Sequence, residues 1–317
     1  MKVVAAVIAA LCASAALAQD YPNRPIRLVV PNAPGSSIDT MTRIVGAKLG
    51  ETLGQSVVVE NRDGAAGLIG MEAAKNSKPD GYLLVSASNG SMLIAPLMRK
   101  APPYDSVKDF SFVSTFAVMP NVLVVNPGLP VNSVKELIDY SRANPGKVNM
   151  SSAGVGSQSH LSGVLLMTMA SFDSLHVPHK GGGPSVTAVA AGQTHWTTAP
   201  APAVMGQVKA GRLRAIAHTS PRRLQLLPDM PAVAETVQGY DYSGWAGLIG
   251  PQGLPAPISQ RLHAALHKTM AQSDVVAALA GQGAEVFVGS PEDFRKFVQQ
   301  EYANTAKVMK AAQLQPE

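Results

Sequence analysis

Residues 26–39 read IRLVVPNAPGSSID and predict a strand, a loop and the start of a helix. The first five residues are almost wholly apolar, as in a buried strand, and the prolines and glycine that follow interrupt regular structure. Apolar residues then recur with helical spacing from Ile38 to Leu49. Ser36 or Ser37 is a good N-cap, and Asp39 suits the first turn. A Gly/Ser-rich helix start presents free backbone N–H groups and the positive end of the helix dipole, so the stretch predicts backbone binding of a carboxylate or phosphate.

Strand and helix patterns alternate along the rest of the chain. Strands are expected at residues 57–60, 82–86, 121–125, 148–152, 213–219 and 243–249, and helices at 67–75, 133–144, 161–169, 258–270 and 291–309. This order predicts an α/β fold with mostly parallel sheets and helices on both faces. Residues 148–169 repeat the order of strand, Gly/Ser loop and helix, which favours two α/β lobes. Ligands in such folds lie at the carboxyl ends of strands, where loops 31–39, 86–91 and 152–160 are placed.

The first 18 residues have the pattern of a cleaved secretory signal peptide, with Lys2, an apolar run to Leu11 and a small-x-small site at Ala16–Ala18. The apolar run is too short to span a membrane, and no later segment has about 20 uninterrupted apolar residues. The only cysteine, Cys12, lies inside this segment, so the mature chain is expected to carry no disulfide and no thiol chemistry.

The chain carries a formal net charge of +5, and its basic residues are dispersed. Arg222 and Arg223 form the densest point, and no basic run with interleaved aromatic residues occurs. We therefore expect no nucleic-acid surface and no nucleic-acid partner.

The titratable residues do not form a recognisable catalytic or metal-binding pattern. His176 and His179 are separated by a proline and do not share a regular helix face, whereas a zinc site needs three or four ligands. Ser157 lies close to His160 in sequence but lacks the G-x-S-x-G elbow of hydrolases. Gly64, Gly67 and Gly70 have the wrong spacing for dinucleotide binding and are interpreted as loop and helix-packing residues. We expect no metal, no cofactor and no enzyme activity.

Neutral donors on the three loops remain as candidates to hold a ligand without reacting with it. They are Gly35, Ser36, Ser37, Ser86, Ser88, Asn89, Gly154, Gly156 and Ser157.

An ordered set of motifs makes the chain resemble a known family over essentially the whole mature sequence. The motifs are Tyr21–Pro31, Ala33–Gly35 with Asp39, Leu53–Arg62, Pro79–Tyr82, Tyr104–Asp105, Lys108–Phe110, Leu129–Val131 with Ser133, Ser152–Ser157 with His160 and Leu161, His176–Gly181, Leu227–Pro231 and Trp245–Gly247. The set resembles the Bug family, the TctC-like periplasmic receptors of tripartite tricarboxylate transporters. No single motif is decisive, but their order is specific.

The resemblance implies a type II periplasmic-binding-protein fold, in which two α/β lobes close on a small carboxylate. Residues 121–125 and 245–249 are then expected to be the crossing strands. Lobe one is expected to comprise 19–122 plus 248–317, and lobe two 123–247. The resemblance also implies a periplasmic location, membrane transporter subunits as partners and a monomeric receptor.

The ligand-binding residues implied by the resemblance lie on the three loops and at two sheet ends. They are Ala33, Gly35, Ser36, Ser37, Asp39, Ser86, Ser88, Asn89, Ser152, Gly154, Gly156, Ser157, His160, His179 and Ala199. The chain departs from the family where Ser36-Ser37 replaces Gly-Gly, His179 replaces Tyr and Ala199 replaces an acidic residue. The loss of that carboxylate favours a mono- or dicarboxylate over an amino acid, whose ammonium would pair there.

Three functions follow, and a receptor for a carboxylate is favoured among them. A hydrolase using Ser157 and His160 lacks a placed acid–base pair. A signalling adaptor would need the same ligand-closed state as a transport receptor, so the sequence leaves these two open.

Overall fold

The structure is a computed structural model that describes residues 21–316. The described chain divides into two compact units. Unit 1 comprises the chain up to Ala117 with Ala246–Leu279 and Val286–Gln300, and unit 2 comprises Val118–Trp245, Ala280–Glu285 and the residues from Glu301 onward. The expected signal peptide lies outside the described residues. Among residues 21–316, no helix combines the length and apolar character needed to cross a membrane.

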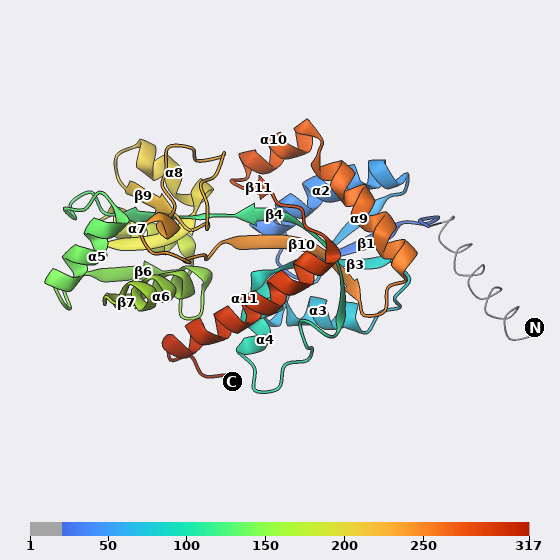
Figure 1. Cartoon of the computed structure of the whole chain (residues 1–317), viewed down its shortest axis with the longest axis horizontal. Helices are drawn as coiled ribbons and strands as arrows, with labels where there is room; N and C mark the ends of the chain where they lie inside the picture. Colours follow the sequence, from blue (N-terminus) through green and yellow to red (C-terminus); the bar gives the residue numbers. More distant parts are fainter. Residues whose placement is uncertain (1–20, 317) are drawn as a thin grey trace, which may run out of the picture. The chain divides into compact units, whose positions relative to one another are not determined.

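Unit 1 is built on a six-stranded sheet in the order β11-β4-β10-β3-β1-β2 (Figure 1). Its strands are β1 (Ile26–Val30), β2 (Val57–Asn61), β3 (Leu83–Ser88), β4 (Phe110–Met119), β10 (Gly244–Pro251) and β11 (Glu285–Val286). Its helices are α2 (Ser37–Leu53), η1 (Ala65–Gly67), α3 (Leu68–Lys75), η2 (Gly90–Ile94), α4 (Ala95–Leu97), α9 (Ala256–Met270), α10 (Ser273–Gly281) and α11 (Pro291–Ala311), of which α10 and α11 end in unit 2. β1 runs parallel to β2 and β3, whereas β10 runs antiparallel to β3.

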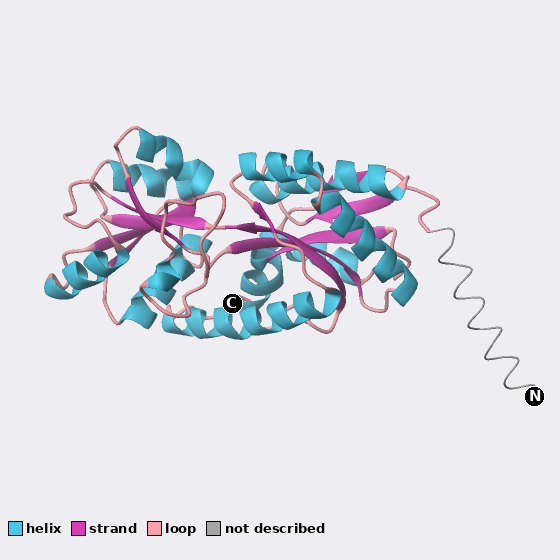
Figure 2. Ribbon diagram, turned by 45° about the horizontal axis from the view of Figure 1, so that its top comes forward, coloured by secondary structure: helices cyan, strands magenta, loops and turns pink. Residues whose placement is uncertain are grey.

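Unit 2 is built on a five-stranded sheet in the order β7-β6-β8-β5-β9, with helices beside its strands (Figure 2). Its strands are β5 (Asn121–Val125), β6 (Asn149–Ser152), β7 (Leu175–Pro178), β8 (Trp196–Pro200) and β9 (Arg214–His218). Its helices are α5 (Val134–Ala143), α6 (Gln158–Ala170), α7 (Gly182–Ala190), α8 (Ala201–Lys209) and η3 (Val233–Glu235). β6 is parallel to β7 and β8, whereas β5 is antiparallel to β8 and β9.

The sheets are therefore mixed rather than mostly parallel. The parallel strands β1, β2, β3 and β6, β7, β8 follow the predicted alternation of strands and helices. β5 runs antiparallel to β8 and β9, and β10 runs antiparallel to β3, so both strands interrupt this alternation. β5 comes shortly after the chain has passed from unit 1 to unit 2, and β10 contains the point where the chain returns to unit 1.

The chain passes from unit 1 to unit 2 within β4, after Ala117, and back within β10, after Trp245, and it changes unit again after Leu279, Glu285 and Gln300. The second passage lies in the segment expected for it. The first precedes the expected segment, because Asn121–Val125 forms β5 and lies wholly inside the sheet of unit 2. The lobe bounds 19–122 plus 248–317 and 123–247 stay a prediction.

Serine side chains cap the starts of α5 and α11. The Ser133 hydroxyl accepts from the Glu136 amide at the start of α5, and the Ser290 hydroxyl accepts from the Asp293 amide at the start of α11. In each case a side-chain oxygen satisfies an N–H group that has no acceptor within the helix.

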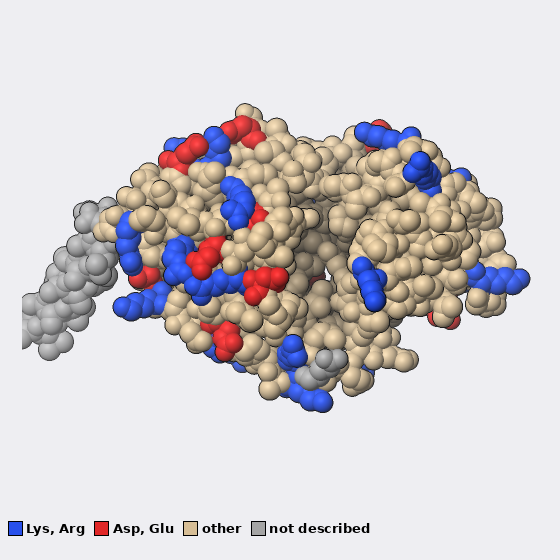
Figure 3. Space-filling view, turned by 180° about the vertical axis from the view of Figure 1, so that it is seen from behind, with Lys and Arg blue, Asp and Glu red and all other residues tan. Residues whose placement is uncertain are grey.

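Charged residues are scattered over the surface. On the face shown in Figure 3, Lys and Arg are interrupted by Asp, Glu and uncharged residues, and no continuous basic area covers that face. This distribution agrees with the dispersed charges of the sequence.

Candidate ligand-binding site

The first candidate loop ends at the start of α2, in unit 1. Gly35 has a φ of 78°, a left-handed conformation that favours glycine, and Ser36 is the N-cap with a φ of −66° and a ψ of 158°. The Ser36 hydroxyl accepts from the Asp39 amide at 3.4 Å. The amides of Ser37 and Ile38 occupy the first two helical positions and have no acceptor within the helix. These two amides are the donors that this helix start offers to an anion.

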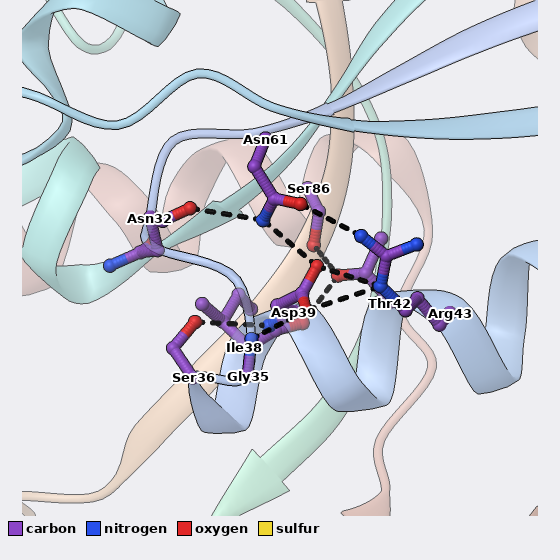
Figure 4. Close-up of polar contacts among 9 residues, drawn as sticks. All are labelled: Asn32, Gly35, Ser36, Ile38, Asp39, Thr42, Arg43, Asn61 and Ser86. Atoms are coloured by element: carbon purple, nitrogen blue, oxygen red, sulfur yellow. Dashed lines mark hydrogen bonds and ion pairs between the residues drawn. The ribbon is translucent and has the colours of Figure 1, made fainter.

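Asp39 lies beneath this loop and is only 3% exposed. Its carboxylate accepts from the Gly35 amide at 2.8 Å, from Asn61 Nδ2 at 2.9 Å and from Arg43 Nε at 3.1 Å (Figure 4). Burial by itself would raise the pKa of Asp39, but the hydrogen bonds from Arg43, Gly35 and Asn61 outweigh it and hold the pKa below its ordinary value. Asp39 therefore shapes the loop through bonds within unit 1.

The loop after β3 is also internally bonded. Ser86 is fully buried, and its hydroxyl accepts from Thr42 Oγ1 of α2 at 2.6 Å. The Ser88 amide donates to Ser91 Oγ at 3.2 Å, and Asn89 precedes the η2 turn. Ser86 therefore joins β3 to α2, while Ser88 and Asn89 lie at the carboxyl end of the sheet next to the first loop.

A third loop of unit 1, residues 63–67, was not predicted from the sequence as part of the site. Gly64, Ala65, Ala66 and Gly67 all have positive φ, at 124°, 49°, 58° and 96°. Two consecutive alanines in this region are strained, and such strain is concentrated at functional sites. A Cβ on Gly67 would lie 2.8 Å from the Pro31 carbonyl oxygen, so this loop packs directly against the first one. The glycines were correctly interpreted as loop and packing residues, but no sequence signal marks the alanines.

The equivalent loop of unit 2 ends at the start of α6. Ser157 is the N-cap, with a φ of −66° and a ψ of 160°, and its hydroxyl accepts from the His160 amide at 3.3 Å and donates to the Gly154 carbonyl at 2.6 Å. The amides of Gly154 and Gly156 donate to Ser152 Oγ and His160 Nδ1, each at 3.1 Å. The predicted glycine donors are thus used inside the loop, and the first-turn amides without an acceptor in the helix are those of Gln158 and Ser159.

Three histidines gather beside this loop. The rings of His160 and His176 are stacked, with centroids 3.9 Å apart and an interplanar angle of 11°. Burial, and then the neighbouring His176, lowers the pKa of His160 from 6.5 to about 4. Burial, followed by the nearby His179, also lowers the pKa of His176. The His179 amide donates to the Ser152 carbonyl at 2.9 Å. His176 was not among the predicted site residues, because its place on β7 could not be read from the sequence.

The His160 imidazole does not contact the Ser157 hydroxyl as a catalytic base would. Its Nδ1 accepts from the Gly156 amide, while Ser157 Oγ is occupied by the cap. This geometry does not support the Ser157–His160 hydrolase. Among residues 21–316, no three His, Cys, Asp or Glu side chains lie close enough to hold a metal ion.

Ala199 lies in the apolar core of unit 2 rather than at the loop surface. It is 5% exposed and packs in a cluster with Val122, Val186, Val189 and Val204. Its neighbour Thr198 points to the opposite face of the sheet, where its hydroxyl lies 3.5 Å from the Ser159 carbonyl. A role for Ala199 in ligand choice stays a prediction, and its packing does not favour one.

Buried polar atoms without a hydrogen-bond partner occur beside both groups of candidate loops, and also elsewhere in the described chain, as at Thr115 and His218. Within residues 21–316, Asn32 Oδ1 in unit 1 and Gln158 Nε2 and His179 Nε2 in unit 2 are buried side-chain atoms with no hydrogen-bond partner. Such atoms are uncommon in folded proteins because each carries a desolvation cost of about 1–3 kcal/mol. Their position on the candidate loops fits groups that are satisfied by a polar ligand.

Comparisons with known proteins agree on one family. Residues 41–314 match the family described as tripartite tricarboxylate transporter family receptor (TctC). BugT of Bordetella pertussis is 35% identical over 297 residues, which cover 92% of this chain and 90% of BugT. Rpa4515 of R. palustris, solved with adipate, is 34% identical with a TM-score of 0.76, over 94% of this chain and all of Rpa4515. MatC of Rhodopseudomonas palustris, solved with bound malate, is 30% identical with a TM-score of 0.71, over 91% of this chain and 99% of MatC.

The chain belongs to the tripartite tricarboxylate transporter family of receptors. It has the mixed α/β, two-sheet fold of type II periplasmic binding proteins, as the sequence resemblance implied. It is a TctC-type solute-binding protein, and its family is one of binding receptors rather than enzymes.

Proposed function

We propose that this receptor captures a small mono- or dicarboxylate that has no free α-amino group, for uptake by the membrane subunits of a tripartite transporter. The observation that carries the proposal is the pair of Gly-Ser helix starts at α2 and α6, each at the carboxyl end of a parallel strand. The relatives solved with adipate and malate bind dicarboxylic acids, which supports the same ligand class here.

The donors proposed for the ligand are neutral. They are the first-turn amides of Ser37, Ile38, Gln158 and Ser159, supported by the Ser36, Ser37 and Ser157 hydroxyls and by the buried Nε2 atoms of Gln158 and His179. Residues 31–39 and 152–160 contain no Lys or Arg. Backbone amides at a helix start suit a carboxylate because they combine donors with the positive dipole end. They also avoid the cost of a buried cation that lacks a partner when no ligand is bound.

The cellular setting forms a second part of the proposal. Residues 1–18 are removed as a signal peptide, and the mature receptor works in the periplasm as a monomer. A strain that lacks the gene tests whether the role is transport or sensing. Two quantities are measured in it: uptake of the acid, and the transcriptional response of the cells to the acid. Loss of uptake with an intact response supports transport, and the reverse supports sensing.

Removing one cap tests the site. Ser157→Ala is expected to weaken binding of the bound acid by roughly 1–2 kcal/mol, because it removes a half-buried hydrogen-bonding group that orders the start of α6. Ser133→Ala is the matched control, since Ser133 caps α5 in the same way but lies outside the candidate loops. Calorimetry should show weaker binding for Ser157→Ala only. Unchanged affinity would remove Ser157 and its helix start from the site.

The ligand class is tested by a thermal-shift screen. Adipate, malate and succinate are compared with aspartate and glutamate at matched concentrations, since a ligand at 100 times its Kd adds about 2.7 kcal/mol of stability. Stabilisation by the first group alone supports the proposal. Stabilisation by an unmodified amino acid would contradict it.

A further inference from the structure

The starts of α2 and α6 share the same backbone conformation and the same kind of hydrogen bond. In each, a left-handed glycine precedes a serine N-cap, with φ values of 78° at Gly35 and 74° at Gly156. In each, the amide of that glycine donates to the side chain of the third helical residue. The acceptor is the Asp39 carboxylate in unit 1, at 2.8 Å, and the His160 imidazole in unit 2, at 3.1 Å. The two side chains therefore hold the same element of backbone in place.

The two acceptors differ in charge. Asp39 is a buried carboxylate that is neutralised by Arg43. His160 is neutral, because burial and His176 lower its pKa to about 4. Since the Gly156 amide donates to Nδ1, that nitrogen must be unprotonated, and the proton of the neutral ring lies on Nε2.

His176 completes the arrangement from the neighbouring strand β7. Its ring lies flat against that of His160, and its Nε2 is 2.6 Å from Ser152 Oγ. The same hydroxyl accepts from the Gly154 amide. The stacked rings thus reach both ends of the loop, Ser152 at the end of β6 and Gly156 before the cap.

We propose that His160 and His176 are a positioning pair that holds loop 152–157 in its binding shape while remaining uncharged, an inference that rests on the carboxylate site proposed for this loop. A carboxylate in the place of His160 could hold Gly156 equally well, as Asp39 holds Gly35. It would also put a negative charge beside the bound acid and repel it. The neutral pair supplies the geometry and leaves the positive end of α6 to the ligand.

Nuclear magnetic resonance tests the pair without any ligand. In the full-length mature protein labelled with ¹⁵N-histidine, His160 is expected to carry its proton on Nε2 at pH 7. The Gly156 amide should exchange with solvent faster in His160→Leu than in the wild type. His195→Leu is the matched control, because His195 Nδ1 also accepts a backbone amide, that of Asn149, at 3.0 Å. A proton on His160 Nδ1, or unchanged Gly156 exchange in a folded His160→Leu, would overturn the inference.

Binding of adipate and malate by calorimetry supplies the second readout. His160→Asn keeps a neutral acceptor and should retain more affinity than His160→Leu, for which we expect a loss of roughly ten-fold or more. His160→Asp keeps an acceptor but adds charge, and should bind weakest. His176→Phe keeps the stack and should fall between His176→Leu and the wild type. His160→Asp binding as well as His160→Asn would contradict the requirement for neutrality. If no organic acid binds the wild type, the proposed function fails, and the resonance measurement alone decides the pair.

Discussion

At the scale of single residues, Asp39 was predicted as a ligand-binding residue, and the structure places it in a buried position where it holds the first loop. The sequence predicts that it lies in the first turn of the helix that follows the anion-binding loop 31–39. In the structure its carboxylate accepts hydrogen bonds from the Gly35 amide, Asn61 Nδ2 and Arg43 Nε (Figure 4). An exposed carboxylate there would repel an anionic ligand, whereas a buried and neutralised one shapes the loop without opposing it.

Ala199 offers a sharp residue-scale prediction. Ala199→Asp would bury a carboxylate among valines, so we expect a loss of several kcal/mol in the free energy of unfolding at pH 7. The control Ala203→Asp places the same charge on the exposed side of α8 and should cost less than about 0.5 kcal/mol. Urea denaturation at pH 7 measures both. A stable Ala199→Asp variant that gains affinity for aspartate would show instead that position 199 faces the ligand.

At the scale of helices and strands, close packing around the first loop can be tested through its glycines. A Cβ on Gly70 of α3 would lie 2.7 Å from the Arg62 carbonyl oxygen and 3.0 Å from Pro31. Gly70→Ala should therefore destabilise the protein by about 1–3 kcal/mol. Gly206 of α8 is the control, because a Cβ added there would meet nothing within 4 Å, and Gly206→Ala should stabilise the helix by about 0.5–1 kcal/mol. Equal effects in thermal unfolding would contradict the packing account.

Elements with strong local signals were predicted well from the sequence. β1, α2, β5, α5, α9 and α11 agree with the prediction to within a few residues, because apolar periodicity and serine caps are local properties. β4, β7, β8 and β11 were not predicted. β7 (Leu175–Pro178) contains a histidine and a proline and is half exposed, so it lacks the apolar run of a buried strand. Its pairing with β6 is a long-range contact that the local sequence does not encode.

The candidate site was predicted as loops but not in its internal bonding. A Gly/Ser-rich helix start can be recognised in the sequence, and the N-cap of α2 was narrowed to Ser36 or Ser37, whereas Ser157 was not predicted as the N-cap of α6. Some partners of the predicted site residues come from other strands: Asn61 Nδ2 of β2 donates to the Asp39 carboxylate, and His176 Nε2 of β7 lies 2.6 Å from Ser152 Oγ. Such pairings depend on sheet order, so the sequence could not separate donors free for a ligand from donors used by the loop itself.

At the scale of the whole molecule, Glu301 and His160 make the free energy of unfolding depend on pH in opposite directions. Burial, and then the nearby Asp241, raises the pKa of Glu301 from 4.5 to about 7. Its contribution is present below pH 4.5 and is lost as the pH rises through 7. The lowered pKa of His160 acts the other way, because its contribution is present above pH 6.5 and is lost as the pH falls toward 4.

Glu301→Gln isolates the first of these effects. Relative to the wild type, the variant should gain roughly 1–3 kcal/mol of unfolding free energy between about pH 5 and pH 8, because the amide has no proton to lose. Glu292→Gln, on the exposed face of the same helix α11, should show no comparable change. Denaturant titrations at the two pH values measure the difference. A pH-independent effect of Glu301→Gln would mean that Glu301 is ionised throughout this range.

The central proposal is that neutral donors at a Gly-Ser helix start bind a carboxylate. Calorimetry of the mature protein with adipate and with its neutral diamide tests it most directly, because the two compounds share length and shape but differ in charge. We expect the acid to bind and the diamide to bind at least roughly ten-fold more weakly, a difference of about 1.4 kcal/mol. Malate provides a second acid if the longer chain does not fit. Equal binding of acid and diamide, or no binding of any acid in the panel, would contradict the account.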